Sequence, residues 1–154
     1  MTPRSRTNQL LYQAELLLQV APGSDEHAEA RRMAAEEGAL ALTELALESL
    51  LREVTEHAAL ERHDWRELLG PEGESVAELQ RLRELAARQG SWLSWLIGKL
   101  EALHASDGAA RRRSGAGAGL IAVGSAAALG DELHACLREA KAEIAALRET
   151  SQEW

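Results

Sequence analysis

The stretch LALTELALESLL, residues 40–51, decides the fold. At about 100° per residue its leucines spread across roughly 240° of a helix, whereas Glu44 and Glu48 share one narrow polar stripe. A helix of a simple four-helix bundle needs only about 100–140° of apolar face. We therefore expect this helix either to run between several neighbours or to present Leu42 and Leu45 to another molecule.

Outward from this stretch, apolar periodicity predicts four helices. They cover about residues 7–20, 24–58, 75–103 and 125–147, the second kinked at Gly38 and the third bent or broken at Gly90-Ser91. No segment alternates like a strand, and a core of leucine and alanine with four Trp, one Tyr and no Phe favours packed helices. The sequence thus predicts an all-α fold, a four-helix up-down bundle that forms one domain over residues 1–154.

The first predicted helix is short for its neighbour. At ~1.5 Å per residue it spans roughly 20 Å, against 40 Å or more for the long helices. It therefore leaves part of residues 40–51 uncovered, and such an apolar patch is unusual on a soluble monomer. We expect a homodimer, or a groove that accepts a partner helix.

Charge and composition restrict the compartment and the partners. The chain of 154 residues has a formal net charge of −8, which repels nucleic acid and anionic lipid, so no DNA partner is expected. Cys136 is the single cysteine, is expected in the core, and indicates a reducing compartment. Polar residues interrupt LLYQAELLLQV (10–20), so we expect no secretion signal and a cytoplasmic protein.

The segment RRRSGAGAGLIAVGSAAALG, residues 111–130, resembles two kinds of site superficially. Gly119 and Gly124 have the spacing of a phosphate-binding loop, but Ser125 follows where the lysine must stand. The uncharged run 114–130 has 17 residues and few large apolar side chains, so no membrane span is expected.

We interpret this segment as a Gly-rich loop between the third and fourth helices, flexible over about 106–120. Its basic tip can clasp an anionic partner and consists of Arg111, Arg112 and Arg113.

Two carboxylate–histidine pairs at i, i+3 raise the possibility of a metal centre. They are Glu101 with His104 and Asp131 with His134, and Glu44 or Glu48 would supply the remaining ligands. The alternative is that these are exposed residues near helix ends, where acidic and basic side chains suit the helix dipole. We favour that alternative and expect no cofactor.

Arg52 and His57 have the R-x4-H spacing that resembles the nuclease motif of HEPN-type helical bundles. A spacing between two residue types arises readily by chance, and the acidic net charge opposes RNA binding. A HEPN-like ribonuclease or RNA-binding bundle is therefore an alternative function, with these two residues as its catalytic candidates.

The densest apolar segment is SWLSWLIGKL, residues 91–100. Trp92 and Trp95 lie three residues apart and share one side of the helix. They either belong to the core or anchor a partner, since exposed tryptophans are frequent hot spots of interfaces.

The segments TNQLLY (7–12) and SWL (91–93), together with the long Glu/Ala/Leu helix between them, resemble a bacterial family of small proteins known only as a domain of unknown function. The resemblance implies an all-helical cytoplasmic protein and assigns no activity. Our hypothesis from the residues is a non-enzymatic helical interaction or scaffold protein that acts as a homodimer through an apolar helix face. A ribonuclease and a carboxylate–histidine metal bundle are the alternatives.

Overall fold

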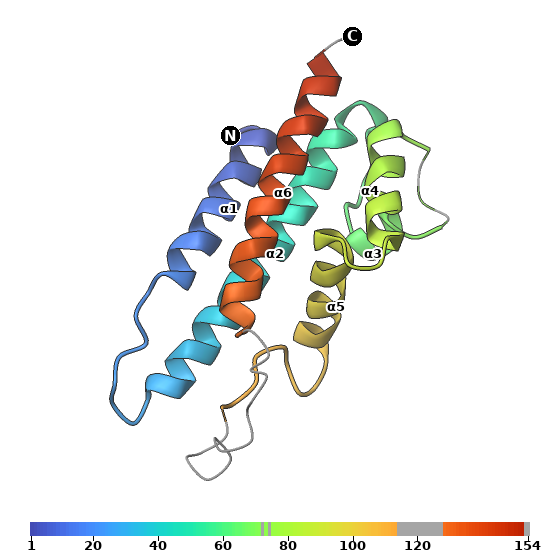
Figure 1. Ribbon diagram of the computed structural model, residues 1–154. Helices are drawn as coiled ribbons and strands as arrows, with labels where there is room; N and C mark the ends of the chain where they lie inside the picture. Colours follow the sequence, from blue (N-terminus) through green and yellow to red (C-terminus); the bar gives the residue numbers. More distant parts are fainter. Residues whose placement is uncertain (72, 74, 114–127, 153–154) are drawn as a thin grey trace.

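The computed structural model describes residues 1–71, 73, 75–113 and 128–152, and all its regular elements are helical (Figure 1). The all-α prediction is confirmed for this part of the chain, which contains no strand. The Gly-rich stretch 114–127 and the expected start of the last helix at Ser125 lie outside the described residues. The elements are α1 (Pro3–Leu18), α2 (Ala28–Val54), η1 (Glu56–Ala58), α3 (Trp65–Leu68), α4 (Ala77–Ala87), α5 (Trp92–His104) and α6 (Leu129–Gln152).

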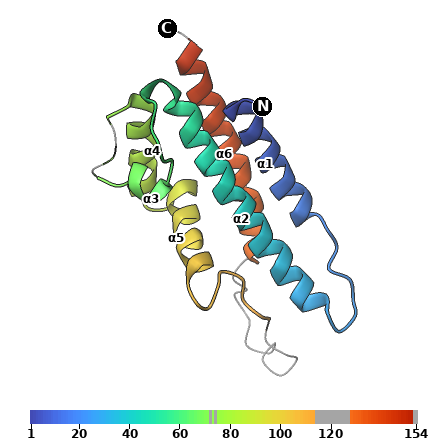
Figure 2. The same ribbon diagram turned by 180° about the vertical axis from the view of Figure 1, so that it is seen from behind.

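Figures 1 and 2 show α1, α2 and α6 side by side as the long helices, with α3, α4 and α5 beyond α2. α1 begins where Thr2 accepts a hydrogen bond from the Ser5 N–H, with Pro3 in the first turn. It packs antiparallel on α2, and the Thr7 hydroxyl donates to Ser49 Oγ at 2.9 Å in the buried seam between them. This hairpin and α6 together position the candidate site.

The predicted third helix is two helices, α4 and α5. Gly90 adopts φ +86°, which favours glycine and ends the helical path. Ser91 then begins α5 by accepting a hydrogen bond from the Ser94 N–H, and its hydroxyl donates to the Leu85 carbonyl at 2.5 Å. The short helix α3 was not predicted, and α2 ends at Val54 rather than near residue 58.

α2 is the central helix and contacts α1, α3, α4, α5 and α6. Leu40, Leu47, Leu50 and Leu51 are each 5% exposed or less, so the apolar patch expected along residues 40–51 is reduced to Leu45 and part of Leu42. Leu42 is half-buried, and only Leu45 is exposed, at 45%. The physical reason is that α3, α4 and α5 cover sides of α2 that the short α1 cannot reach.

Candidate functional site

The exposed side of α1 carries large apolar residues one helical turn apart. Tyr12 and Leu16 are 59% and 43% exposed, and Val20, just beyond the helix, is 61% exposed. Tyr12 and Leu16 are four residues apart and therefore neighbours on the helix surface, and Val20 follows in the turn after the helix; these three residues are here named the α1 stripe. The α1 stripe is an apolar surface that α2 and α6 leave uncovered.

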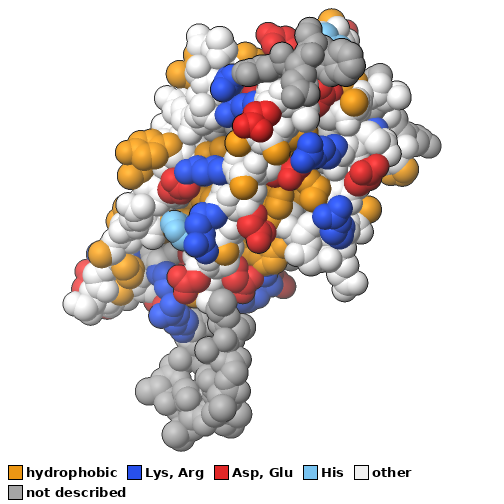
Figure 3. Space-filling model, turned by 45° about the horizontal axis from the view of Figure 1, so that its top comes forward, with side chains coloured by type: hydrophobic (Ala, Val, Ile, Leu, Met, Phe, Trp, Pro, Cys, Tyr) orange, Lys and Arg blue, Asp and Glu red, His pale blue; other side chains and the backbone are white. Residues whose placement is uncertain are grey.

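The exposed residues of α1 around the stripe carry no charge, and the carboxylate beside them, Glu15, is paired with Lys141. Between residues 8 and 20, the exposed positions outside the stripe are Asn8, Gln13 and Gln19, in a chain of which 27% is charged. Figure 3 shows hydrophobic and uncharged side chains along the edge formed by α1, whereas Lys, Arg, Asp and Glu gather over α6. Depletion of charge with retention of tyrosine and amides is typical of the core of a protein interface.

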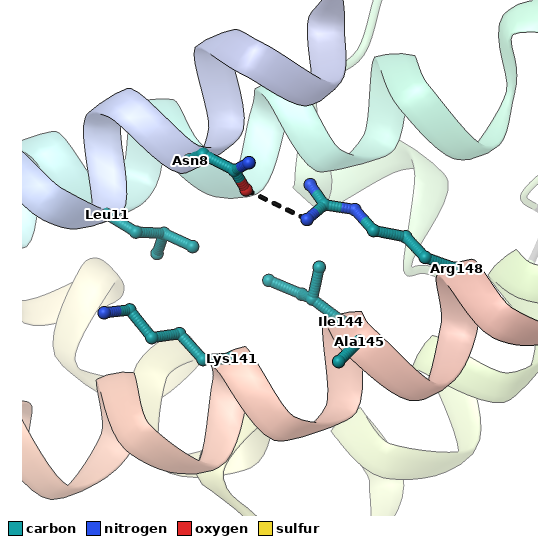
Figure 4. Close-up of a pocket in the computed structure, with 6 residues that line it drawn as sticks. All are labelled: Asn8, Leu11, Lys141, Ile144, Ala145 and Arg148. Atoms are coloured by element: carbon teal, nitrogen blue, oxygen red, sulfur yellow. Dashed lines mark hydrogen bonds between the residues drawn. The ribbon is translucent and has the colours of Figure 1, made fainter.

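A groove of about 310 Å³ runs between α1 and α6 beside the stripe. Leu11 and Ile144 are buried and form its floor (Figure 4). Asn8 and Arg148 point toward each other across it, and Arg148 donates to Asn8 Oδ1 at 2.9 Å. We name this feature the α1–α6 groove; it is lined by Asn8, Leu11, Lys141, Ile144, Ala145 and Arg148.

The two cations of the groove are each paired with a carboxylate. Arg148 donates from Nε and Nη2 to the two oxygens of Glu53, at 2.7 and 3.1 Å, in a bidentate pair. Lys141 forms an ion pair with Glu15 of α1. The groove therefore combines an apolar floor with an electrically balanced rim.

Behind the groove lies a small apolar pocket that shares Leu11 and Ile144 with it. Its volume of about 20 Å³ has room for roughly one water-sized group. Trp92 lines this pocket, is 8% exposed, and its Nε1 has no hydrogen-bond partner among the described residues. The structure thus places Trp92 in the core, while Trp95 is half-buried and donates to Glu132 Oε2 at 2.7 Å.

A second, polar pocket of about 360 Å³ gathers several residues singled out in the sequence. Glu44, Glu48 and Arg52 of α2 line it together with His104 of α5 and His63. The remaining lining residues come from the segment between α2 and α4 and are Glu61, Arg62, Asp64 and Arg66.

In this polar pocket Glu44 is already engaged, because it accepts from Trp65 Nε1 at 2.9 Å and lies 2.9 Å from His104 Nε2. Burial, with Glu44 and then Asp64 nearby, raises the pKa of Glu48. Burial, with the charge of Arg52, lowers the pKa of His63. The pocket is polar and of mixed charge.

The sequence profile of a family of unknown function, DUF6586, matches residues 1–154. The chain belongs to this family. The family resemblance noted from the sequence is confirmed in this respect. No curated protein and no solved structure matches the DUF6586 chain. In the described part of the chain, every helix is too short or too polar to cross a membrane.

The metal and nuclease candidates of the DUF6586 chain do not converge. The described residues contain no group of three or more His, Cys, Asp and Glu side chains that could hold a metal ion. His104 does meet Glu44, as the metal interpretation requires, but Trp65 is the further partner of that carboxylate. Arg52 lines the polar pocket, whereas His57 is exposed in η1 and does not line it. The remaining metal candidates, Glu101, Asp131 and His134, are exposed.

The basic tip is held against the first half of α2. The backbone N–H of Arg113 donates to Glu29 Oε1 at 2.6 Å, and Arg32 donates to the Arg111 carbonyl at 2.7 Å. Glu37 accepts from the N–H groups of residues 109 and 110 at 2.9 and 3.1 Å. The side chains of Arg111, Arg112 and Arg113 are exposed. The loop expected over about 106–120 continues into residues 114–120, outside the described part.

The α1 stripe was not predicted from the sequence. Its signal there is the spacing of Tyr12 and Leu16, which lie one helical turn apart on the side opposite the buried Leu10 and Ala14.

Proposed function

We propose that this DUF6586 protein is a non-enzymatic helical interaction protein that contacts its partner through the α1 stripe and the α1–α6 groove. The observation that carries the proposal is the set of Tyr12, Leu16 and Val20, exposed by 59%, 43% and 61%, whose exposed neighbours between residues 8 and 20 are uncharged. Single exposed apolar residues are ordinary on soluble proteins, but a continuous apolar row marks an interaction site.

The α1 stripe supplies part of the free energy of a specific contact, and the rest must come from the groove and its rim. Burying a large apolar side chain fully contributes about 1.5–3 kcal/mol. The three stripe residues are about half exposed, so covering them contributes roughly 2–4 kcal/mol before the groove is filled. Tyrosine adds a hydroxyl that can exchange hydrogen bonds at the rim, a common property of hot-spot residues.

Site-specific photo-cross-linking tests the proposal. A photo-reactive phenylalanine analogue is introduced at Tyr12 or Leu16, and, as a matched control, at Ala41, which is exposed on α2. We expect covalent adducts with a protein, whether foreign or a second copy, from positions 12 and 16 and not from position 41. Folded protein that gives no adduct from either α1 position, or equal adducts from position 41, refutes the proposal.

A further inference from the structure

Resting on the proposed function, we infer that the partner is a second copy of this chain, packed antiparallel along α1 about a two-fold axis. Three features of the described residues support a second copy as the partner. They are the lack of charge on the exposed face of α1, the presence of a projecting Tyr12 and a groove on the same surface, and the distribution of charge at the two ends of α1.

The first feature is electrostatic. Each copy has a formal net charge of −8, so two copies repel except where they meet through uncharged surface. Every exposed residue from Asn8 to Val20 is uncharged. The charges that adjoin this face, on Lys141 and Arg148, are paired with carboxylates of the same chain, so the face leaves no unpaired charge with which to select a charged partner. Its amides, at Asn8, Gln13 and Gln19, offer both donors and acceptors and therefore suit an identical face.

The second feature is shape. In a two-fold interface the same patch must supply both partners of every contact, so a projecting group and the hollow that receives it must lie on one surface. Tyr12 projects from α1 at 59% exposure, one turn after Asn8 at the edge of the α1–α6 groove. The groove has a volume of about 310 Å³ and an apolar floor, and it can accept the Tyr12 ring of the second copy.

Hydrogen bonds are available for the hydroxyl of that ring. Arg148 has five N–H donors, of which three are engaged, two with Glu53 and one with Asn8. The ammonium group of Lys141 has three N–H donors and forms one ion pair, with Glu15. The tyrosine hydroxyl can accept from either cation without breaking an existing pair.

The third feature gives the direction. Arg4 and Arg6 are exposed at the start of α1, whose first turn has no acidic residue. Parallel packing would bring these arginines of the two copies together, which costs electrostatic energy. Antiparallel packing sets them beside the carboxyl end of the other α1, where the helix dipole is negative and Glu26 is exposed in the following turn.

The mass of the purified full chain, measured by light scattering and sedimentation, tests the inference. We expect a dimer, with dissociation at least tenfold easier in Tyr12→Glu and Leu16→Glu and with unchanged helicity by circular dichroism. Leu45→Glu is the matched control, because it charges the exposed leucine of α2 and should leave the dimer intact. A wild-type monomer at high concentration overturns the inference. If position 12 still cross-links to a foreign protein, the proposed function stands without it.

Disulfide trapping tests the direction. Cys136 is buried, so cysteines introduced at Ser5 and Gln19 are the reactive ones. Antiparallel packing predicts that a chain with Ser5→Cys cross-links to a chain with Gln19→Cys. Cross-links only between identical positions overturn the antiparallel arrangement, and dissociation by Leu45→Glu in place of Leu16→Glu overturns both the surface and its occupant.

Discussion

Replacing Leu51 by alanine measures how completely α2 is enclosed by its own chain. Leu51 is 0% exposed on the helix that all the other α-helices contact. Truncating a fully buried leucine to alanine costs about 2–5 kcal/mol, because apolar contacts are lost and a cavity remains. With a urea dependence of about 2 kcal/mol per molar, the unfolding midpoint should fall by about 1–2.5 M. Urea titration followed by far-ultraviolet circular dichroism measures this shift.

The control is Leu45→Ala on the same helix. Leu45 is 45% exposed and loses much less buried surface, so we expect a cost of about 0.5–1 kcal/mol. Both variants are compared at one protein concentration, since association raises apparent stability. Equal losses in the two variants, or a loss below about 1 kcal/mol for Leu51→Ala, would refute the enclosure of α2.

Three further predictions concern polar groups. Hydrogen bonds from Arg32 and from a backbone N–H lower the pKa of Glu29 from an ordinary 4.5 to about 2. The ionised Glu29 therefore stabilises the fold above pH 4.5, and this stabilisation is lost as the pH falls toward 2. Glu29→Gln should reduce the fall in melting temperature between pH 4.5 and 2, and a fall equal to that of the wild type contradicts the pairing. Burial raises the pKa of Cys136 to about 12, so Ellman's reagent at pH 8 should react much more slowly with native than with unfolded protein; equal rates would disprove burial. Trp65→Phe removes the indole donor to Glu44 and should cost about 1 kcal/mol in urea unfolding, and an unchanged midpoint would show that this bond contributes nothing.

The helices that periodicity can detect were predicted from the sequence, and those too short for periodicity were not. α1, α2 and the leucine stripe of α6 are long enough for several turns of the apolar pattern. A bend or break at Gly90-Ser91 was predicted, and the structure has a break there, with a positive φ at Gly90 followed by the N-cap Ser91. α3 has four residues, about one turn, and its only signal in the sequence is the N-capping residue Asp64.

The candidate site was harder to predict, because a surface depends on what covers each helix. The wide apolar arc of residues 40–51 predicts that this helix has neighbours on several sides, and α2 does have them. The helices that cover α2 are determined by α3 and by the turn between α4 and α5. The sequence of residues 40–51 holds no information about either. The metal interpretation combined His104 with Glu44 or Glu48, and His104 does contact Glu44. The indole N–H of Trp65, which is distant in sequence, donates to the same carboxylate.

The same reasoning explains why we propose that α1, and not α2, contacts a second molecule. α2 has a broad apolar surface and several helices to cover it. α1 has two separate apolar sides: Leu10 and Ala14 are buried at its contact with α2, while Tyr12 and Leu16 lie on the opposite side. Apolar residues on opposite sides of one helix favour cover on both sides, and the described part of this chain covers one side, which is the basis of the dimer that we propose. In the proposed dimer the uncharged amides around Tyr12 meet their own copies, since in a protein of net charge −8 an uncharged surface lets identical molecules approach with less repulsion.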